Sequence, residues 1–303
     1  MKAGTDLSEM PRAFADFHVT VRGAAHRKKG TGCQDFSCSS CFGSCAVAAV
    51  ADGHGDIRYF RSAFGARFAA LAALGAVRTF LKREGPDDIS GDAEAKFVQL
   101  KKNIILNWNR KVAAHYASHP FTEEELSPLS AHRREQLRNG KLVETAYGTT
   151  LIAAAVTPSF WLGLQIGDGD CFGVSGDQKI FVPKEDGLIG NLTTSLCEPD
   201  AYYKFHHIFR REKPSVVVLS TDGVRNSFSS GAYYENFMNR VAGEFSVGAK
   251  KRTQTALGEF LSEMTKRGSG DDLSVAGIAA LEVSEIPTAG IPCAESVCAG
   301  KTV

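Results

Sequence analysis

The chain has 303 residues, of which 43% are hydrophobic and 23% are charged, and its formal net charge is +1. These values are typical of a soluble globular protein, and so small a charge gives no support to binding of nucleic acid or of an anionic membrane surface. Residues 1–17 lack the apolar stretch of a signal peptide, and the most apolar helical candidate, residues 60–81, contains three arginines. We therefore expect a cytoplasmic monomer with neither a membrane nor a nucleic-acid partner.

The first half of the chain is predicted to mix strands with long helices. In chain order we expect a half-buried strand at 13–22, a basic loop at 23–32 and a hairpin turn at 42–44 that leads to an apolar strand. Two helices should follow at 58–83 and 93–116, and a charged insertion at 121–139. From residue 148 the pattern changes to short strands, expected at 149–156, 160–166, 171–175, 179–182, 214–220 and 273–281.

Three expectations complete this description of the second half. Residues 171–175 should be the hairpin partner of the strand before them, and the polar residues 186–207 should form turns. Two helices, at 232–245 and 250–266, precede the last strand. The tail from residue 283 has no periodicity, which predicts disorder.

Eight cysteines occur, and Cys33, Cys38 and Cys41 follow the C-x4-C-x2-C spacing of plant-type iron–sulfur proteins. A cluster or zinc site is therefore one interpretation. Cys38 and Cys41, however, lie in a predicted strand, where their side chains point to opposite faces and cannot converge on one metal without a bend. We favour buried thiols in a reducing compartment.

Acidic residues stand where predicted strands end. Asp52, Asp168 and Asp222 each follow an apolar run, and the pair Asp271-Asp272 directly precedes the last strand. A single Asp-Gly pair is most simply a turn, but its recurrence at strand ends favours a site. In antiparallel sheets the end of one strand and the start of its neighbour lie on the same edge, so these acids should gather at one rim.

Such a gathering of carboxylates predicts a bound cation. Several carboxylates held close together cannot all stay ionised unless a positive charge sits between them, and no basic residue directly flanks Asp52, Asp168 or Asp222. Oxygen ligands select hard ions, so we expect Mn²⁺ or Mg²⁺ rather than zinc. Two ions sharing a carboxylate would support hydrolysis of a phosphate ester by water that the ions acidify.

Five motifs occur in the order and approximate spacing of the type 2C metal-dependent serine/threonine protein phosphatases. They are Asp52-Gly53-His54-Gly55, Gly148-Thr149-Thr150, Gly167-Asp168-Gly169, Ser220-Thr221-Asp222-Gly223 and Asp271-Asp272-Leu273-Ser274-Val275. The chain resembles this family, in its bacterial-type branch, over residues 17–281. The resemblance implies an α+β fold, a four-layer αββα sandwich of two mostly antiparallel sheets with helices outside. It also implies one catalytic domain over 12–283, with an insertion at about 85–146 and a disordered tail at 284–303.

The resemblance also implies a metal site of two ions. Asp52 would bridge both ions, and Gly53 would contribute its carbonyl. Asp222 and Asp271 would complete the coordination of the first ion. Alignment of the last strand favours Asp271 as the ligand, with Asp272 as the alternative.

Other positions carry roles that the resemblance leaves more open. Asp35, in Gln34-Asp35, would lie near the second ion, and Asp168 would hold a looser third ion. His54 is a candidate general acid for the leaving alkoxide or a residue that orients a carboxylate.

Two positions depart from the family pattern. The arginine that usually precedes the early acid by five residues is Gly30 here, so His26, Arg27 or Lys28 are candidates to bind the phosphate. The alternative is that these are solvated surface charges. The acid often found four residues after Asp222 is Asn226, which predicts a weaker third ion.

We therefore predict a cytoplasmic, Mn²⁺- or Mg²⁺-dependent hydrolase of phosphoserine and phosphothreonine in proteins. It would act by a metal-bridged hydroxide without a covalent intermediate and would oppose a serine/threonine kinase. Two alternatives remain open, a catalytically weak or inactive phosphatase-fold regulatory module and a small-molecule phosphohydrolase.

Overall fold

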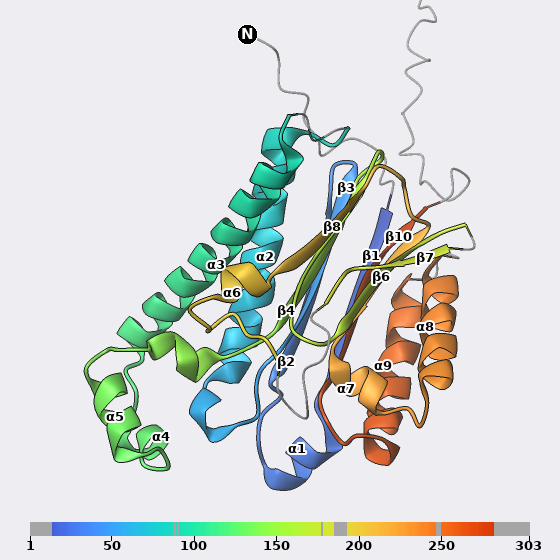
Figure 1. Ribbon diagram of the computed structural model, residues 1–303. Coiled ribbons are helices and arrows are strands. Elements are labelled where there is room, and N and C mark those ends of the chain that lie inside the picture. The colour runs from blue at the N-terminus through green and yellow to red at the C-terminus, as the bar shows by residue number, and fades with distance from the viewer. Residues whose placement is uncertain are drawn as a thin grey trace, which may run out of the picture.

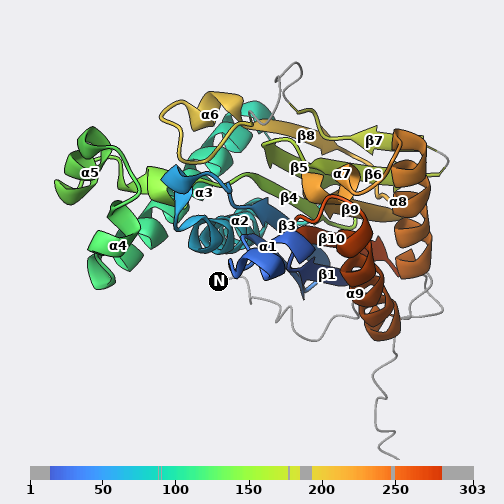
Figure 2. The same ribbon diagram turned by 90° about the horizontal axis from the view of Figure 1, so that it is seen from below.

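Two five-stranded sheets pack face to face, and helices cover their outer faces (Figures 1 and 2). The computed structural model describes residues 14–281 except 88, 90, 177, 185–192 and 247–249, so the predicted tail lies outside the described residues. Every pair of neighbouring strands is antiparallel. The α+β, four-layer αββα architecture expected from the sequence is therefore confirmed.

Each sheet combines strands from distant parts of the chain. The first has the order β1-β10-β9-β6-β7, with the strands Phe14–Val21, Leu273–Ala280, Val216–Ser220, Asp170–Ser175 and Gln178–Phe181. The second has the order β2-β3-β4-β5-β8, with the strands Asp35–Phe42, Cys45–Asp52, Leu151–Val156, Trp161–Ile166 and His206–Arg210.

Strand β3 is buried on both faces because its side chains are small and apolar. Ala48 and Val50 pack between the two sheets, whereas Val47 and Ala49 pack against the helical layer. Alternate residues of a strand point to opposite faces, so this one strand joins two cores. Only its last residue, Asp52, escapes full burial.

Long helices form the outer layers and short ones surround the sheet ends. The long helices are α2 and α3 on the second sheet and α8 and α9 on the first, spanning Ser62–Glu84, Ala93–Ser118, Gly231–Ser246 and Lys250–Arg267. The short ones are α1 (Ala24–Lys29), η1 (Ile57–Tyr59), α4 (Glu123–Leu126), α5 (Ala131–Arg138), η2 (Val143–Tyr147), α6 (Ala201–Lys204) and α7 (Asp222–Asn226). In the described residues, only α2 is long and apolar enough to cross a membrane, and 56% of that stretch is buried inside the protein.

The expectation that β6 is the hairpin partner of β5 is wrong. Strand β6 pairs with β9 and β7 in the first sheet, with Asp170 opposite Ser220. The turn Gly167-Asp168-Gly169 therefore carries the chain from one sheet to the other. Gly167 has φ +108, and a Cβ on Gly169 would lie 2.5 Å from the carbonyl oxygen of Ser220, so both positions favour glycine.

Two further local expectations need correction. The basic loop at 23–32 contains the helix α1, which ends at Gly30 with φ +76. The polar stretch 186–207 runs into β8, an edge strand that pairs with β5. Its five residues include two histidines and an arginine, so it lacked the apolar signal of a buried strand.

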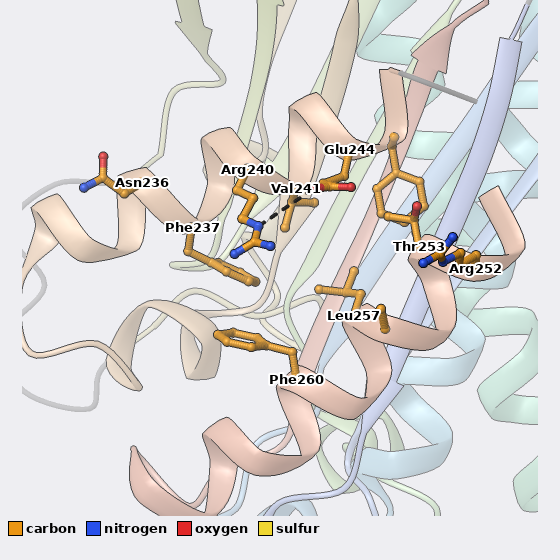
Figure 3. A pocket seen from close by; sticks show the side chains of 11 residues that line it. Asn236, Phe237, Arg240, Val241, Glu244, Arg252, Thr253, Leu257 and Phe260 are labelled. Carbon is orange, nitrogen blue, oxygen red and sulfur yellow. Dashed lines mark ion pairs between the residues drawn. The ribbon is translucent and has the colours of Figure 1, made fainter. Parts of the chain in front are cut away.

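An apolar groove of about 690 Å³ lies between α8 and α9 (Figure 3). The rings of Phe237 and Phe260 stack in it with centroids 5.2 Å apart, and Leu257 lies beside them. Arg240 and Glu244 form an ion pair at its rim. None of the strand-end acids lines this groove, so it is separate from the predicted metal site.

The predicted insertion is fastened to the core by Arg61, which is 6% exposed. Its guanidinium donates to both carboxylate oxygens of Glu125 on α4, at 2.7 and 2.8 Å. It also donates to the carbonyl oxygen of His119 at 2.6 Å and to the hydroxyl of Tyr147 at 3.0 Å. Such a planar, two-pronged contact fixes both position and orientation.

Glu125→Ala should lower the free energy of unfolding by about 2 kcal/mol, because it leaves the buried guanidinium of Arg61 without its carboxylate. Urea unfolding at pH 7 measures this change. Glu123→Ala is the matched control, since Glu123 pairs with Arg138 on the same insertion but is 75% exposed. Its loss should stay below about 1 kcal/mol. Equal losses in the two variants would contradict the prediction.

The effect of Glu125→Ala should also depend on pH. Burial raises the pKa of Glu125, but hydrogen bonds from Arg61 and Thr122 outweigh this effect and hold the pKa below its usual value. A carboxyl group whose pKa is lower in the folded state than in the unfolded state stabilises the folded protein. This stabilisation is complete above the unfolded-state pKa of about 4.3, and it is lost as the pH falls through the folded-state pKa. The difference between parent and variant should therefore shrink below about pH 4. A constant difference on acidification would exclude this explanation.

Candidate metal centre

The acids that end separate strands meet at one edge of the sandwich. Asp35 begins β2 and Asp52 ends β3, and the two stand opposite each other in the hairpin register. Asp222 follows β9 and Asp271 precedes β10, and these strands pair in the first sheet. The charge of Asp222 raises the pKa of Asp52, so these two carboxyl groups, one from each sheet, lie close together.

Three of these carboxyl groups are destabilised in their charged form. Burial raises the pKa of Asp52, and the charges of Asp35 and Asp222 raise it further. Burial is also the main reason that the pKa values of Asp35 and Asp222 are raised, and neighbouring carboxylates add to both shifts. No lysine or arginine ion pair among the described residues involves these three acids. The site therefore holds negative charge that lacks a counter-ion.

The residues present fit a divalent cation. Asp222 Oδ1 is buried without a hydrogen-bond partner, while its Oδ2 accepts from Asn226 Nδ2 at 2.9 Å. An orphaned buried oxygen beside other carboxylates is a favourable ligand for Mn²⁺ or Mg²⁺. In the described part of the chain, no group of three acidic, histidine or cysteine side chains lies close enough together to hold a metal ion as it stands. The carboxylates are neighbours that an ion would draw together.

The backbone of Asp52 is fixed by the Gly148-Thr149-Thr150 motif. The amide of Asp52 donates to Thr150 Oγ1 at 3.0 Å, and its carbonyl accepts from Thr149 Oγ1 at 2.8 Å and from the Thr150 amide at 2.9 Å. The sequence singled out this motif without a role for its hydroxyls. These threonines hold the central acid in place, and the signal for them was their recurrence in the family pattern.

Gly53 lies where no side chain fits. A Cβ there would lie 2.7 Å from the carbonyl oxygens of both Gln34 and Ser62. The Gly53 amide donates to the Gln34 carbonyl at 3.1 Å, which ties the end of β3 to the start of β2. The predicted use of the Gly53 carbonyl as a metal ligand stays a prediction.

Asp271 and Asp272 have different surroundings. Asp272 is 3% exposed and accepts hydrogen bonds from the amides of Gly23 and Gln34, each at 2.5 Å, and from His26 Nδ1 at 2.9 Å. Asp271 has a side chain that is 49% exposed, and its charge raises the pKa of Asp52. Because Asp272 is already engaged, the alternative that it binds the ion has no support in the geometry, and Asp271 is the better placed ligand.

Asp168 lies on the turn between the sheets. Its charge raises the pKa values of Asp222 and His54, which places it on the same edge. Its carbonyl accepts from Lys184 Nζ at 3.0 Å. Lys184 also pairs with Asp170 at 3.0 Å, and no pattern in the sequence predicted this cation next to Asp168.

His54 is half-buried beside the acids, and its ring centroid lies 4.7 Å from that of Tyr59 in an edge-on arrangement. Burial lowers the pKa of His54 to about 4, although the charge of Asp168 opposes the shift. The imidazole is therefore neutral near pH 7. A neutral ring fits the orienting role better than that of a proton donor.

The basic segment lies at the rim, but its side chains are partly engaged. His26 donates to Asp272, and Arg27 Nη1 donates to the carbonyl oxygen of Arg22. Arg27, Lys28 and Lys29 are exposed. Of the predicted phosphate-binding residues, His26 is thus committed within the protein, whereas Arg27 and Lys28 face solvent.

The cysteines do not form a cluster. Cys38 packs toward the helical layer and Cys41 toward the space between the sheets, as expected for the two faces of a strand. Neither forms a disulfide, and nor do Cys33 and Cys45. Burial and the charges of Asp272 and Asp35 raise the pKa of Cys33, so the cysteine closest to the acids remains protonated.

Comparisons with known proteins place this arrangement in a family. A family model described as protein phosphatase 2C matches residues 22–262, and no curated protein matches the chain. The chain is similar to the solved catalytic domain of the serine/threonine protein phosphatase PstP in complex with two manganese ions. The identity is 15% and the TM-score 0.52, over 89% of this chain and 99% of that one.

Two other solved structures show the same likeness. One is the Mycobacterium tuberculosis serine/threonine phosphatase PstP/Ppp, with 15% identity, a TM-score of 0.50 and coverage of 89% of this chain and 99% of that one. The other is PppA, described as a key regulatory component of T6SS in Pseudomonas aeruginosa, with 13% identity, a TM-score of 0.54 and the same coverage. At these identities the structures establish the fold, and the family match covers most of the sequence. The chain belongs to the protein phosphatase 2C family.

Proposed function

We propose that this protein is a Mn²⁺- or Mg²⁺-dependent phosphatase that hydrolyses phosphoserine and phosphothreonine in proteins. The observation that carries the proposal is the buried group of Asp35, Asp52 and Asp222, which has no basic partner and leaves one oxygen of Asp222 unpaired. We further propose that it acts as a cytoplasmic monomer opposite a serine/threonine kinase.

Each residue of the site has a distinct task in this reaction. Asp52, Asp222 and Asp271 would bind the first ion. Asp35, which stands opposite Asp52 in the β2–β3 hairpin, would complete the coordination of the second ion. When bound, the two ions supply an acidified water and neutralise the charge of the phosphoryl group. No side chain of the site needs to form a covalent bond to phosphorus.

Substrate orientation falls to the residues around the acids. His54, neutral and half-buried, is assigned to orient a neighbouring carboxylate or the ion-bound water network. The exposed guanidinium of Arg27 is assigned to the phosphate of the substrate, because a fork of N–H donors suits phosphate oxygens. His26 is not available for that task while it donates to Asp272.

A second candidate function is a regulatory module with weak or no catalysis. It is favoured by Asn226, whose amide donates to Asp222 where the family often has another acid, and by the absence of the usual arginine. Turnover of phosphopeptides decides between the two, and turnover of sugar phosphates alone would favour a small-molecule phosphohydrolase.

Asp222→Ala should reduce hydrolysis of p-nitrophenyl phosphate with Mn²⁺ by about 100-fold or more, because even outer contacts of a metal site are worth 10- to 100-fold. Mn²⁺ at about 100 times its Kd should stabilise the parent by about 2.7 kcal/mol and the variant much less. Steady-state rates and thermal unfolding with and without Mn²⁺ measure both effects. Glu123→Ala is the control. Equal activity of Asp222→Ala and the parent would eliminate this site.

Arg27→Gln should raise KM for a phosphothreonine peptide about 3- to 10-fold with little change in Mn²⁺ affinity, since it removes a charge-assisted contact to substrate and no ligand. Initial rates over a range of peptide concentrations measure the effect. Arg78→Gln, on the outer helix α2, controls for the loss of one positive charge. If the two variants have the same KM, Arg27 does not bind the phosphate.

A further inference from the structure

One buried carboxylate joins three segments at the acidic edge. Asp272 accepts from the Gly23 amide before α1, from His26 Nδ1 on α1 and from the Gln34 amide before β2, although these residues lie 249, 246 and 238 positions away. A carboxylate only accepts hydrogen bonds, so Nδ1 of His26 is the donor. Only 3% of the surface of Asp272 is exposed, so its carboxylate is almost completely shielded from water.

A second set of contacts holds the same segments together. The hydroxyl of Thr265 accepts from the Ala24 amide at 3.0 Å and donates to the carbonyl of Asp271 at 2.8 Å. The Ala25 amide donates to the Gly270 carbonyl at 2.8 Å. A Cβ on Gly23 would lie 2.5 Å from that same carbonyl oxygen, so the two backbones are in direct contact.

This clasp, which we define as Asp272 with His26 and the amides of Gly23 and Gln34, lies between two proposed ligands. Asp271 directly precedes Asp272, and the two stand just before strand β10 of the first sheet. Asp35 directly follows Gln34 and begins β2 of the second sheet. His26 Nε2 also lies 3.7 Å from Asp271 Oδ1. The clasp therefore sets the spacing between acids that different sheets contribute.

We propose that Asp272 and His26 are positioning residues of the metal site: Asp272 binds no ion, and its bond to His26 holds together the two segments that carry Asp35 and Asp271. The proposal rests on the proposed function and deepens it. It gives a task to the histidine of the basic segment, which the sequence had assigned to phosphate binding.

The test compares His26→Ala with His26→Asn in the full chain. The asparagine amide can place a donor near the position of Nδ1, so it should restore what alanine loses. In the metal-free protein, hydrogen exchange of the backbone segments 33–38 and 268–275 should be faster in His26→Ala and close to the parent in His26→Asn. His207→Ala, which breaks a similar bond to Glu94 at 3.1 Å far from the acids, should leave both segments unchanged.

Mn²⁺ binding gives the second readout. Calorimetry should show about tenfold weaker Mn²⁺ binding in His26→Ala and a parent-like value in His26→Asn, as for other residues that orient metal ligands. Asp272→Asn should resemble His26→Ala. The proposal is overturned if alanine and asparagine at position 26 behave alike, or if Asp272→Asn alone abolishes Mn²⁺ binding as a ligand variant would. If the unmodified protein binds Mn²⁺ but hydrolyses no phosphopeptide, the proposed function is refuted. The proposed positioning role of the clasp is not affected by that result.

Discussion

The structure depends on one unfavourable contact, the approach of Asp52 to Asp222 and Asp35 inside a protein edge with no basic partner. Bringing carboxylates together out of water raises the free energy of the folded chain unless protons or a cation offset it. The raised pKa values of Asp35, Asp52 and Asp222 express this cost, since burial and neighbouring carboxylates favour their protonated forms. The hydrophobic sandwich behind the acids provides the stability that lets the chain maintain this arrangement.

The two-sheet architecture explains how these acids meet. Asp35 and Asp52 belong to the second sheet, whereas Asp222 and Asp271 follow or precede strands of the first. Thr221 joins the two groups, since its hydroxyl donates to Asp35 Oδ2 at 2.8 Å and accepts from the Ser274 amide at 3.0 Å. Small residues such as Ala48 between the sheets allow the close approach. The core packing therefore determines the geometry of the site.

The sequence could predict the features that depend on local pattern. Apolar runs ending in aspartate identified the ends of β3, β5 and β9, and the sandwich followed from the family resemblance. Pairing of β6 with β9 could not be predicted, because a short glycine turn suits a hairpin and a crossing between sheets equally well. The sequence pattern favoured Asp271 over Asp272 as the ligand, but the contacts that occupy Asp272 could not be predicted, since they depend on donors such as Gly23 and Gln34 that lie more than 200 residues away.

The two departures from the family pattern change the charge of the site in opposite directions, since Gly30 removes a positive charge and Asn226 removes a negative one. Asn226 donates a hydrogen bond to Asp222 where an acid would add a negative charge, so fewer anions compete at the edge and Asp222 keeps Oδ1 free. The exposed cations of α1 lie at the same rim, held there by Asp272. A site with less negative charge and a fixed basic helix attracts anionic substrates more strongly, while it holds an additional cation less well. Asn226 therefore favours phosphate capture over the binding of a third ion, and the cations of α1 offset the loss of the usual arginine.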